Sequence, residues 1–525
     1  MQLTGQNFIG MELSGKGKDF FYAMNPADNT ELPVKFHEAT KNEIDQAIVK
    51  AEKAFTVYSK KNGNDKAFFL ETIAEQILEL GDELIQRCSD ETGLPAARLT
   101  GERGRTVNQL KMFAELLREG SWVDARIETA NPERQPLPKP DIRSMQKALG
   151  PVGVFGASNF PLAFSVAGGD TASALAAGCT VVVKAHPAHP GTCEFIAHAI
   201  TQAAKKTNMP DGVFSMIHSR SNEVGMAIVK HPLIKAIGFT GSFKGGKAIY
   251  DEAVRRQEPI PVYAEMGSTN PIFILPGAMR ERKEEIAQGL TASVTLGVGQ
   301  FCTNPGLVFY EDSDDALHFQ NTAVKNFNEV SPGIMLTKNI LQTYNNGLEN
   351  SSAQNGVKLL SRNKNNDESK STAALFQTEA KNFLTNKKLE EEIFGPATLT
   401  VIAESKEEII KAAQSLSGHL TATIHATDED LKNYKELIEI LERKVGRLII
   451  NGYPTGVEVC SSMVHGGPFP ATTDSRTTSV GTLAITRFAR HVSYQNFPDK
   501  LLPEELKNDN PLEIWRLLNG KWENS

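Results

Sequence analysis

The sequence has few of the features that mark secreted, membrane or nucleic-acid-binding proteins. Its five cysteines among 525 residues are scattered and odd in number, which argues against a disulfide framework. No window offers the about 20 consecutive apolar residues of a membrane span, and the N-terminus lacks the basic start and apolar stretch of a signal peptide. Lys and Arg total 56 against 63 Asp and Glu, a net charge of −7, which disfavours a nucleic-acid binder. We therefore expect a soluble, cytoplasmic protein with reduced thiols and with neither a membrane nor a nucleic-acid partner.

The length and composition predict a globular chain of several domains. Hydrophobic residues make up 40% of the chain and charged residues 23%, and at about 150 residues a domain there is room for roughly two to four domains. Residues 41–58 place apolar side chains at helical spacing behind a capping-box pair, Thr40 and Glu43. Helical patterning continues to about Trp122, after which four prolines within residues 126–143 predict an extended connecting arm.

From Gly150 onward, short β-branched runs alternate with helical segments. Expected strands lie at 152–155, 180–183, 213–217, 236–239 and 262–264, and expected helices at 162–177, 192–206, 222–230 and 243–255. After Glu265 the alternation restarts with strands at 272–275, 306–310, 398–403, 421–425 and 447–450 and a helix at 280–297. Such alternation predicts parallel sheets covered on both faces, with ligands beyond the carboxyl ends of the strands. The polar stretch 362–372 is expected to be a surface loop.

Common nucleotide and metal motifs are absent or incomplete. G-x-G-x-x-G does not occur, and the segment 241–248 nearly matches a P-loop but has Ala248 where a hydroxyl must hold magnesium. Gly241 and Ser242 still lie between a strand and a helix, where backbone N–H groups attract phosphate, so this turn can bind a diphosphate. His186 and His189 are separated by a proline, so no helix puts them on one face, and no metal site is expected.

Three residues carry the groups that acyl transfer requires. Cys302 follows a glycine turn and offers a thiol, Glu265 ends a strand and offers a carboxylate, and Asn159 ends another strand and offers an amide donor. Each has a simpler interpretation on its own: a buried structural cysteine, a solvated acid and a turn residue. Together they predict a nucleophile, a base and an oxyanion donor.

The combination resembles the aldehyde dehydrogenase superfamily. GASNFPLAF, FTGS, EMGSTNP, GQFCTNPG and EEIFGP occur in that family's order, and the resemblance covers roughly residues 20–490. The segments KAHPAHPGT, GERGRT and PFPATTDSRTTSVGT are similar to the branch that contains 2,5-dioxopentanoate (α-ketoglutarate semialdehyde) dehydrogenases, and a bacterial fatty-aldehyde dehydrogenase is also similar there.

The resemblance implies an α/β fold of two doubly wound parallel-sheet domains plus a small β oligomerisation element. The coenzyme-binding domain is expected at 1–123 and 143–264, the catalytic domain at 265–452, and the oligomerisation element at 124–142 and 482–498. A homodimer or homotetramer is implied.

The resemblance also implies roles for individual residues. Cys302 attacks the aldehyde, the Asn159 side chain holds the oxyanion of the thiohemiacetal, and Glu265 activates the water that hydrolyses the thioester. The implied coenzyme-binding residues are Lys184, His186, Gly241, Ser242, Glu392 and Phe394.

Two departures from the family pattern affect specificity. Many NAD-preferring members have a glutamate three residues after the lysine, where this chain has Pro187, and the loss of a carboxylate that would repel a 2′-phosphate favours NADP, with NAD as the alternative. The segment 468–481 replaces a lysine-containing glycine-rich segment, so pocket details from other members do not carry over.

Substrate choice rests on one helix face. Arg105, Asn108, Gln109 and Met112 have helical spacing in the region that lines the family's substrate tunnel, so Arg105 or Gln109 is expected to meet the distal carboxylate of a semialdehyde, with Phe160 beside them. A solvated helix face is the simpler alternative. Three competing functions stay open: oxidation of medium or long-chain aldehydes, a cysteine-dependent esterase or hydrolase, and a catalytically silent relative.

Overall fold

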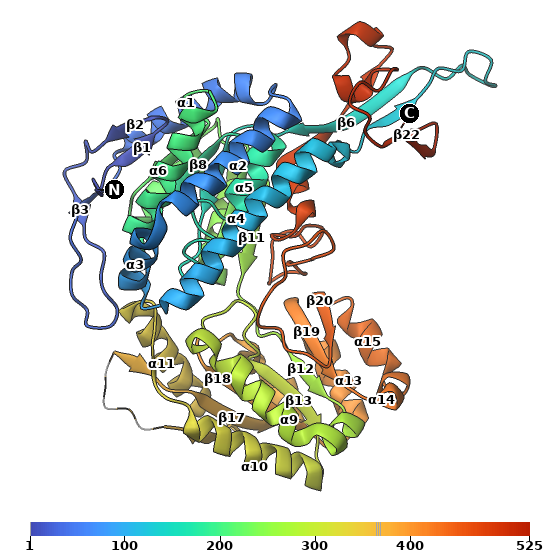
Figure 1. Ribbon diagram of the computed structural model, residues 1–525. Coiled ribbons are helices and arrows are strands. Elements are labelled where there is room, and N and C mark those ends of the chain that lie inside the picture. Colours follow the sequence, from blue (N-terminus) through green and yellow to red (C-terminus); the bar gives the residue numbers. More distant parts are fainter. Residues whose placement is uncertain (1, 364, 366, 368, 525) are drawn as a thin grey trace.

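The computed structural model describes residues 2–363, 365, 367 and 369–524. Within this part of the chain, a seven-stranded sheet forms the centre of each of two lobes, and a smaller sheet forms an arm that projects from the upper lobe (Figure 1). The active-site candidates come from the ends of strands in the two large sheets, from loops between the lobes and, for Arg105 and Gln109, from helix α4 (Ala96–Glu119).

The sheet of the first lobe is parallel over its central strands. The strand order is β11-β10-β7-β8-β9-β1-β2, in which β7 to β11 are parallel and β1 joins β9 in the antiparallel sense. Its strands are β1 (Asn7–Ile9), β2 (Glu12–Ser14), β7 (Val152–Phe155), β8 (Val181–Lys184), β9 (Phe214–Ile217), β10 (Ala236–Gly241) and β11 (Val262–Met266). The chain order reverses between β7 and β10, so a crevice suited to a ligand is expected at their carboxyl ends.

Helices cover both faces of this sheet. They are α1 (Lys41–Tyr58), α2 (Gly63–Glu79), α3 (Gly81–Thr92), α4 (Ala96–Glu119), α5 (Gly169–Ala177), α6 (Pro190–Lys206), α7 (Asn222–Lys230) and α8 (Phe243–Arg255). Helix α1 begins at the predicted capping box, with both the Thr40 and the Glu43 side-chain bonds present.

The expected helix at 162–177 is wrong in its first half. Residues 162–168 form turns, and α5 begins only at Gly169. The backbone N–H groups of Leu162 and Ala163 donate to the carboxylate of Glu102 at 2.8 and 3.0 Å. The Phe164 carbonyl accepts from the Ala157 N–H at 2.8 Å and so is directed away from a helical N–H group four residues later.

The second lobe repeats the α/β arrangement. Its strand order is β15-β17-β18-β13-β12-β19-β20, parallel from β17 to β20 with β15 antiparallel at one edge. The strands are β12 (Ile272–Ile274), β13 (Leu307–Glu311), β15 (Lys358–Arg362), β17 (Ala374–Glu379), β18 (Ala397–Ala403), β19 (His419–His425) and β20 (Val445–Ile450). The helices are α9 (Pro276–Thr295), α10 (Asp314–Glu329), α11 (Lys338–Ser352), α12 (Ala380–Thr385), α13 (Lys406–Ser415), α14 (Asp428–Asn433) and α15 (Lys435–Leu441).

The polar stretch 362–372 follows β15. Residues 364, 366 and 368 of this expected loop lie outside the described residues, and its end forms the short strand β16 (Lys370–Ser371), which pairs with β14 (Gly333–Ile334).

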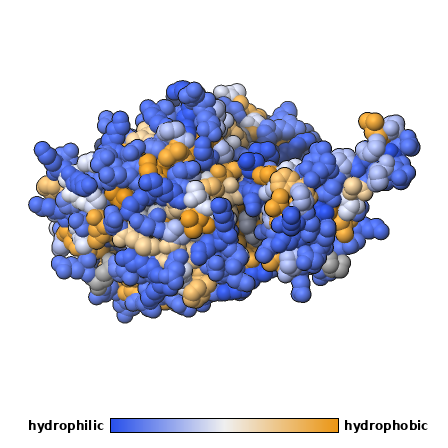
Figure 2. Space-filling model, turned by 90° about the horizontal axis from the view of Figure 1, so that it is seen from above, coloured by the Kyte–Doolittle hydropathy of each residue, from blue (hydrophilic) through white to orange (hydrophobic). Residues whose placement is uncertain are grey.

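The arm consists of a third sheet with the order β21-β6-β5-β22-β23. Its strands are β5 (Arg126–Glu128), β6 (Ile142–Ala148), β21 (Ala489–Gln495), β22 (Arg516–Leu518) and β23 (Lys521–Glu523). Figure 2 shows the arm standing clear of a mainly hydrophilic surface. Among the described helices, none combines the length and the apolar character that crossing a membrane requires.

Candidate active site at the domain junction

Cys302 lies just after a tight turn that ends α9. The turn Leu296–Gly299 has Gly297 and Gly299 at φ values of 55° and 65°, a region that favours glycine. A Cβ on Gly299 would lie 2.3 Å from the carbonyl carbon of Gly395, so glycine is also required for the close approach of the EEIFGP loop. Cys302 as a residue is partly exposed, unlike the buried Cys88, Cys179 and Cys193.

Glu265 and His465 complete a compact group with the thiol. Glu265 belongs to the end of β11 and is 4% exposed, so the interpretation as a solvated acid is excluded. The His465 Nε2 atom lies 2.9 Å from Glu265 Oε1 and 3.5 Å from Cys302 Sγ, and Ser479 Oγ donates to Glu265 Oε2 at 2.5 Å. One ligand atom from each of Cys302, His465 and Glu265 lies within 4.8 Å of the other two.

The surroundings shift the pKa values of Cys302 and Glu265 in opposite directions. Burial, followed by the negative charge of Glu265, raises the pKa of the Cys302 thiol well above its usual value. Burial alone would also raise the pKa of Glu265, but the His465 imidazole and the Ser479 hydroxyl outweigh it and lower that pKa. The resting arrangement is a neutral thiol beside an ionised carboxylate.

Two asparagines tie the neighbouring loops to the cysteine loop. Asn159 is buried, and its Nδ2 donates to the Gln300 carbonyl at 3.0 Å, which leaves its second amide hydrogen for an oxyanion. The Asn270 Nδ2 lies 2.9 Å from both the Cys302 and the Asn304 carbonyl oxygens. Asn270 therefore holds the backbone at the nucleophile and two residues after it.

Four of the six expected coenzyme residues lie at the carboxyl edge of the first sheet. Lys184 ends β8, and burial lowers its pKa to about 8. Ser242 caps α8 by accepting from the Gly245 N–H at 3.3 Å, and Gly241 beside it is exposed. The His186 ring stacks on His189, and burial followed by the charge of His189 lowers its pKa well below the usual value, so His186 is a neutral imidazole.

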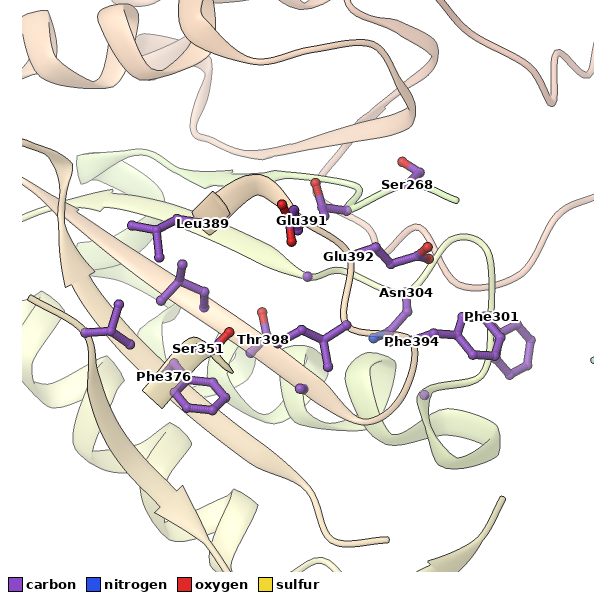
Figure 3. A pocket seen from close by; sticks show the side chains of 17 residues that line it. Ser268, Phe301, Asn304, Ser351, Phe376, Leu389, Glu391, Glu392, Phe394 and Thr398 are labelled. Atoms are coloured by element: carbon purple, nitrogen blue, oxygen red, sulfur yellow. The ribbon is translucent and has the colours of Figure 1, made fainter. Parts of the chain in front are cut away.

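Glu392 and Phe394 belong to the loop that faces the glycine turn. Figure 3 shows the Glu392 side chain between the segments that carry Ser268 and Asn304. Its side chain keeps contact with solvent, yet the surrounding protein raises its pKa to about 7, against the lowering effect of the Ser268 backbone N–H. A Cβ on Gly267 would lie 1.8 Å from Glu392 Oε2, so glycine there leaves room for this carboxylate.

The face of α4 places cationic and amide donors beside aromatic rings. The Arg105 guanidinium carbon lies 5.1 Å from the Phe164 ring centre and 5.9 Å from that of Phe160. The buried Nε and Nη2 atoms of Arg105 and the Nε2 atom of Gln109 have no hydrogen-bond partner among the described residues. The Arg98 guanidinium carbon also lies near Phe160, at 5.2 Å from its ring centre, and its Nη2 donates to the Asn159 carbonyl at 2.7 Å.

Sequence reasoning missed four residues of this site: His465, Ser479, Asn270 and Arg98. His465 and Ser479 lie in the stretch 451–481, where the structure places no helix or strand among the described residues. No periodic pattern could have found them. Arg98 could have been found, because it lies seven residues before Arg105 and thus on the same face of α4. Asn270 lies within the EMGSTNP motif, but no feature of the sequence marked it as a site residue.

Comparisons with known proteins show which proteins the chain is similar to. A sequence profile of the aldehyde dehydrogenase family matches residues 13–469. Alpha-ketoglutaric semialdehyde dehydrogenase 2 of Azospirillum brasilense is 48% identical over 100% of both chains. Alpha-ketoglutaric semialdehyde dehydrogenase of Acinetobacter baylyi is 45% identical over 98% of each chain. The NAD⁺ complex of an aldehyde dehydrogenase from Bacillus cereus has the same fold, with a TM-score of 0.80 and 23% identity over 94% of this chain and 96% of that chain.

The match extends over most of the chain, and the two relatives match over their full length. The resemblance inferred from the ordered motifs is thereby confirmed, as is the predicted fold of two parallel-sheet α/β domains. The chain belongs to the aldehyde dehydrogenase family and is an oxidoreductase.

Proposed function

We propose that this protein oxidises α-ketoglutarate semialdehyde to 2-oxoglutarate with an NAD(P) coenzyme, NADP being preferred. The observation that carries the substrate proposal is the Arg105 guanidinium, which is largely buried and has two donor atoms without a protein partner. A buried cation with free donors binds a carboxylate far better than a neutral chain end. The names of the two full-length relatives support the same substrate.

Glu265 and Asn159 prepare Cys302 for attack on the aldehyde. The Glu265 carboxylate accepts the thiol proton, and the thiolate bonds to the aldehyde carbon to give a thiohemiacetal. The free amide hydrogen of Asn159 donates to the oxyanion that forms, because its other hydrogen is already fixed on the Gln300 carbonyl. When bound, NAD(P)⁺ supplies the two-electron acceptor that turns the thiohemiacetal into a thioester.

Hydrolysis uses the same carboxylate a second time. After Glu265 has released the thiol proton to solvent, it takes a proton from water, and the resulting hydroxide attacks the thioester carbon. The Cys302 thiolate leaves and is reprotonated, and the carboxylate product is set free. The bonds from His465 and Ser479 hold Glu265 in place for both steps.

The carboxyl edge of the first sheet fits a dinucleotide. The exposed N-terminus of α8, with Gly241 and Ser242, would hold the diphosphate. Lys184 would bind the adenosine ribose, and Glu392 the nicotinamide ribose with Phe394 beside it. Pro187 supports the preference for NADP because no carboxylate at that position repels a 2′-phosphate. His186, being neutral, would contribute a hydrogen bond and no charge.

A substrate and coenzyme panel tests the proposal. We expect α-ketoglutarate semialdehyde to have a higher kcat/KM than succinate semialdehyde or hexanal. We also expect a higher kcat/KM with NADP than with NAD. A higher kcat/KM for hexanal would favour the alternative of a medium or long-chain aldehyde dehydrogenase. Ester cleavage without any coenzyme-dependent absorbance at 340 nm would favour a cysteine hydrolase, and inertness toward every aldehyde would favour a silent relative.

The arm is proposed to assemble the chain into a homodimer or homotetramer. Its outermost strands, β21 and β23, are each paired on only one side within the described residues, so their free edges can pair with another chain. The expected domain limits, 1–123 with 143–264, 265–452, and 124–142 with 482–498, and a cytoplasmic location are part of the same proposal. The arm is extended beyond those limits to include β6, β22 and β23, which belong to its sheet. Light scattering of the purified protein measures the number of subunits.

A further inference from the structure

We propose that Cys302, His465 and Glu265 form a Zn²⁺ site through which the metal reversibly inhibits the enzyme. Tetrahedral Zn²⁺ has bonds of about 2.3 Å to sulfur, 2.0–2.1 Å to imidazole nitrogen and 2.0–2.2 Å to a carboxylate oxygen, which places sulfur and nitrogen about 3.6 Å apart and nitrogen and oxygen about 3.4 Å apart. The protein has Sγ and Nε2 at 3.5 Å and Nε2 and Oε1 at 2.9 Å. The sulfur-to-nitrogen spacing therefore matches already, and the imidazole must move from Glu265 by about half an ångström.

The kinds of donor select zinc over magnesium and calcium. A thiolate and an imidazole are ligands for Zn²⁺, whereas Mg²⁺ and Ca²⁺ require oxygen ligands. The thiolate and the Glu265 carboxylate together carry the two negative charges that neutralise Zn²⁺. The positive charge of the nearby Arg105 disfavours a metal cation at Cys302. The negative charge of Glu392 also acts on Cys302 and counteracts this repulsion.

Surrounding contacts hold the ligands without blocking the metal. The Ser479 hydroxyl binds Glu265 Oε2 and leaves Oε1 directed at the imidazole. The His465 backbone N–H donates to Thr478 Oγ1 at 2.8 Å, which fixes the residue in its loop. His465 and Glu265 are 1% and 4% exposed, whereas Cys302 is partly exposed. The metal enters from the cysteine side and keeps its fourth position for water, as in sites with three protein ligands.

Occupation of this site stops the reaction at its first step. The Cys302 thiol releases its proton to solvent when sulfur bonds to the metal, and that sulfur can no longer attack an aldehyde. Glu265 is held as a ligand at the same time and cannot accept a proton. Binding of Zn²⁺ depends only on the three ligands, while the inhibition rests on the proposed function of Cys302.

Binding and inhibition are measured separately on the chelator-treated full-length protein. Co²⁺, a visible probe for zinc sites, is titrated to look for a thiolate-to-metal charge-transfer band, and Zn²⁺ is then added to displace it. ZnCl₂ is also titrated into the dehydrogenase assay, and EDTA is added to restore activity. The variants are His465→Gln, Cys302→Ser and a matched control, His318→Gln, which removes the exposed histidine 3.0 Å from Glu284. Thermal unfolding confirms that each variant is folded.

We expect one Co²⁺ per chain with a charge-transfer band, complete Zn²⁺ inhibition and recovery with EDTA. His465→Gln should weaken metal binding more than about tenfold, Cys302→Ser should abolish the band, and His318→Gln should bind as the wild type does. The proposal is overturned if folded His465→Gln binds Zn²⁺ as tightly as the wild type, or if the band persists in Cys302→Ser. A metal that binds as expected without inhibiting aldehyde oxidation would instead contradict the catalytic role of Cys302.

Discussion

Replacement of Arg105 by Ala should separate carboxylated from neutral aldehydes. The guanidinium presents two buried donors without protein partners, and hydrogen bonds to a charged group contribute about 1.5–3 kcal/mol. At 1.36 kcal/mol for each tenfold change, the loss in kcat/KM for α-ketoglutarate semialdehyde is about 10-fold to 150-fold. Hexanal has no carboxylate, so its kcat/KM should change by no more than about fivefold, the equivalent of the 0.5–1 kcal/mol of the cation–π contacts with the phenylalanine rings.

Two further variants make this comparison specific. Arg105→Lys keeps the charge but not the planar fork, and it should recover only part of the loss. Arg103→Ala is the matched control, because Arg103 lies on the same helix but donates to the Gly81 carbonyl at 2.7 Å, away from the site. Steady-state kinetics with both aldehydes measures the effect, and thermal unfolding checks the fold. An equal loss for hexanal and for the semialdehyde would refute the assignment of Arg105 to the substrate carboxylate.

Three other perturbations test the coenzyme side and the cysteine loop. Gly267→Ala puts a Cβ 1.8 Å from Glu392 Oε2 and should raise the coenzyme KM severalfold with little change in thermal stability. The control Gly101→Ala has open space around the new Cβ and should leave the coenzyme KM unchanged. Equal coenzyme KM values for the two variants would contradict the packing argument. Because the pKa of Glu392 is raised to about 7, the ionised carboxylate, which accepts ribose hydroxyl bonds more strongly than the neutral acid, forms mainly above that pH. The coenzyme KM should therefore fall as pH rises from about 6 to 8, and Glu392→Gln should remove this dependence. Asn270→Ala frees the Cys302 backbone and should lower kcat more than about tenfold while the coenzyme KM stays nearly constant; a change in KM alone would argue against a role in positioning the thiol.

The fold could be predicted in detail where each element has its own local pattern. The capping box at Thr40 and Glu43 fixes the start of α1, and the strand at 152–155 is observed with the predicted limits. The error at residues 162–168 has a cause outside the helical pattern. The Phe164 carbonyl accepts from the Ala157 N–H, just beyond β7, at 2.8 Å, where a helix would direct it to an N–H group four residues later. An Ala-rich, apolar sequence gives no sign of this backbone bond.

The site residues could likewise be predicted where their position has a local cause and not where it depends on a distant segment. The end of β11 predicted the place of Glu265, because parallel strands place their carboxyl ends at one edge. The prediction that Asn159 ends a strand is wrong, since β7 ends at Phe155 and Asn159 lies four residues beyond it. What covers that edge could not be predicted. The stretch 451–481 is anchored there by the Met266 N–H, which donates to the Ala471 carbonyl at 2.8 Å. This contact brings His465 and Ser479 onto Glu265 across sequence separations of 200 and 214 residues. The local sequence pattern of Glu265 predicts a solvated acid, but a distant loop buries this side chain and lowers its pKa. The C-terminal segment therefore determines how the carboxylate is placed beside the thiol.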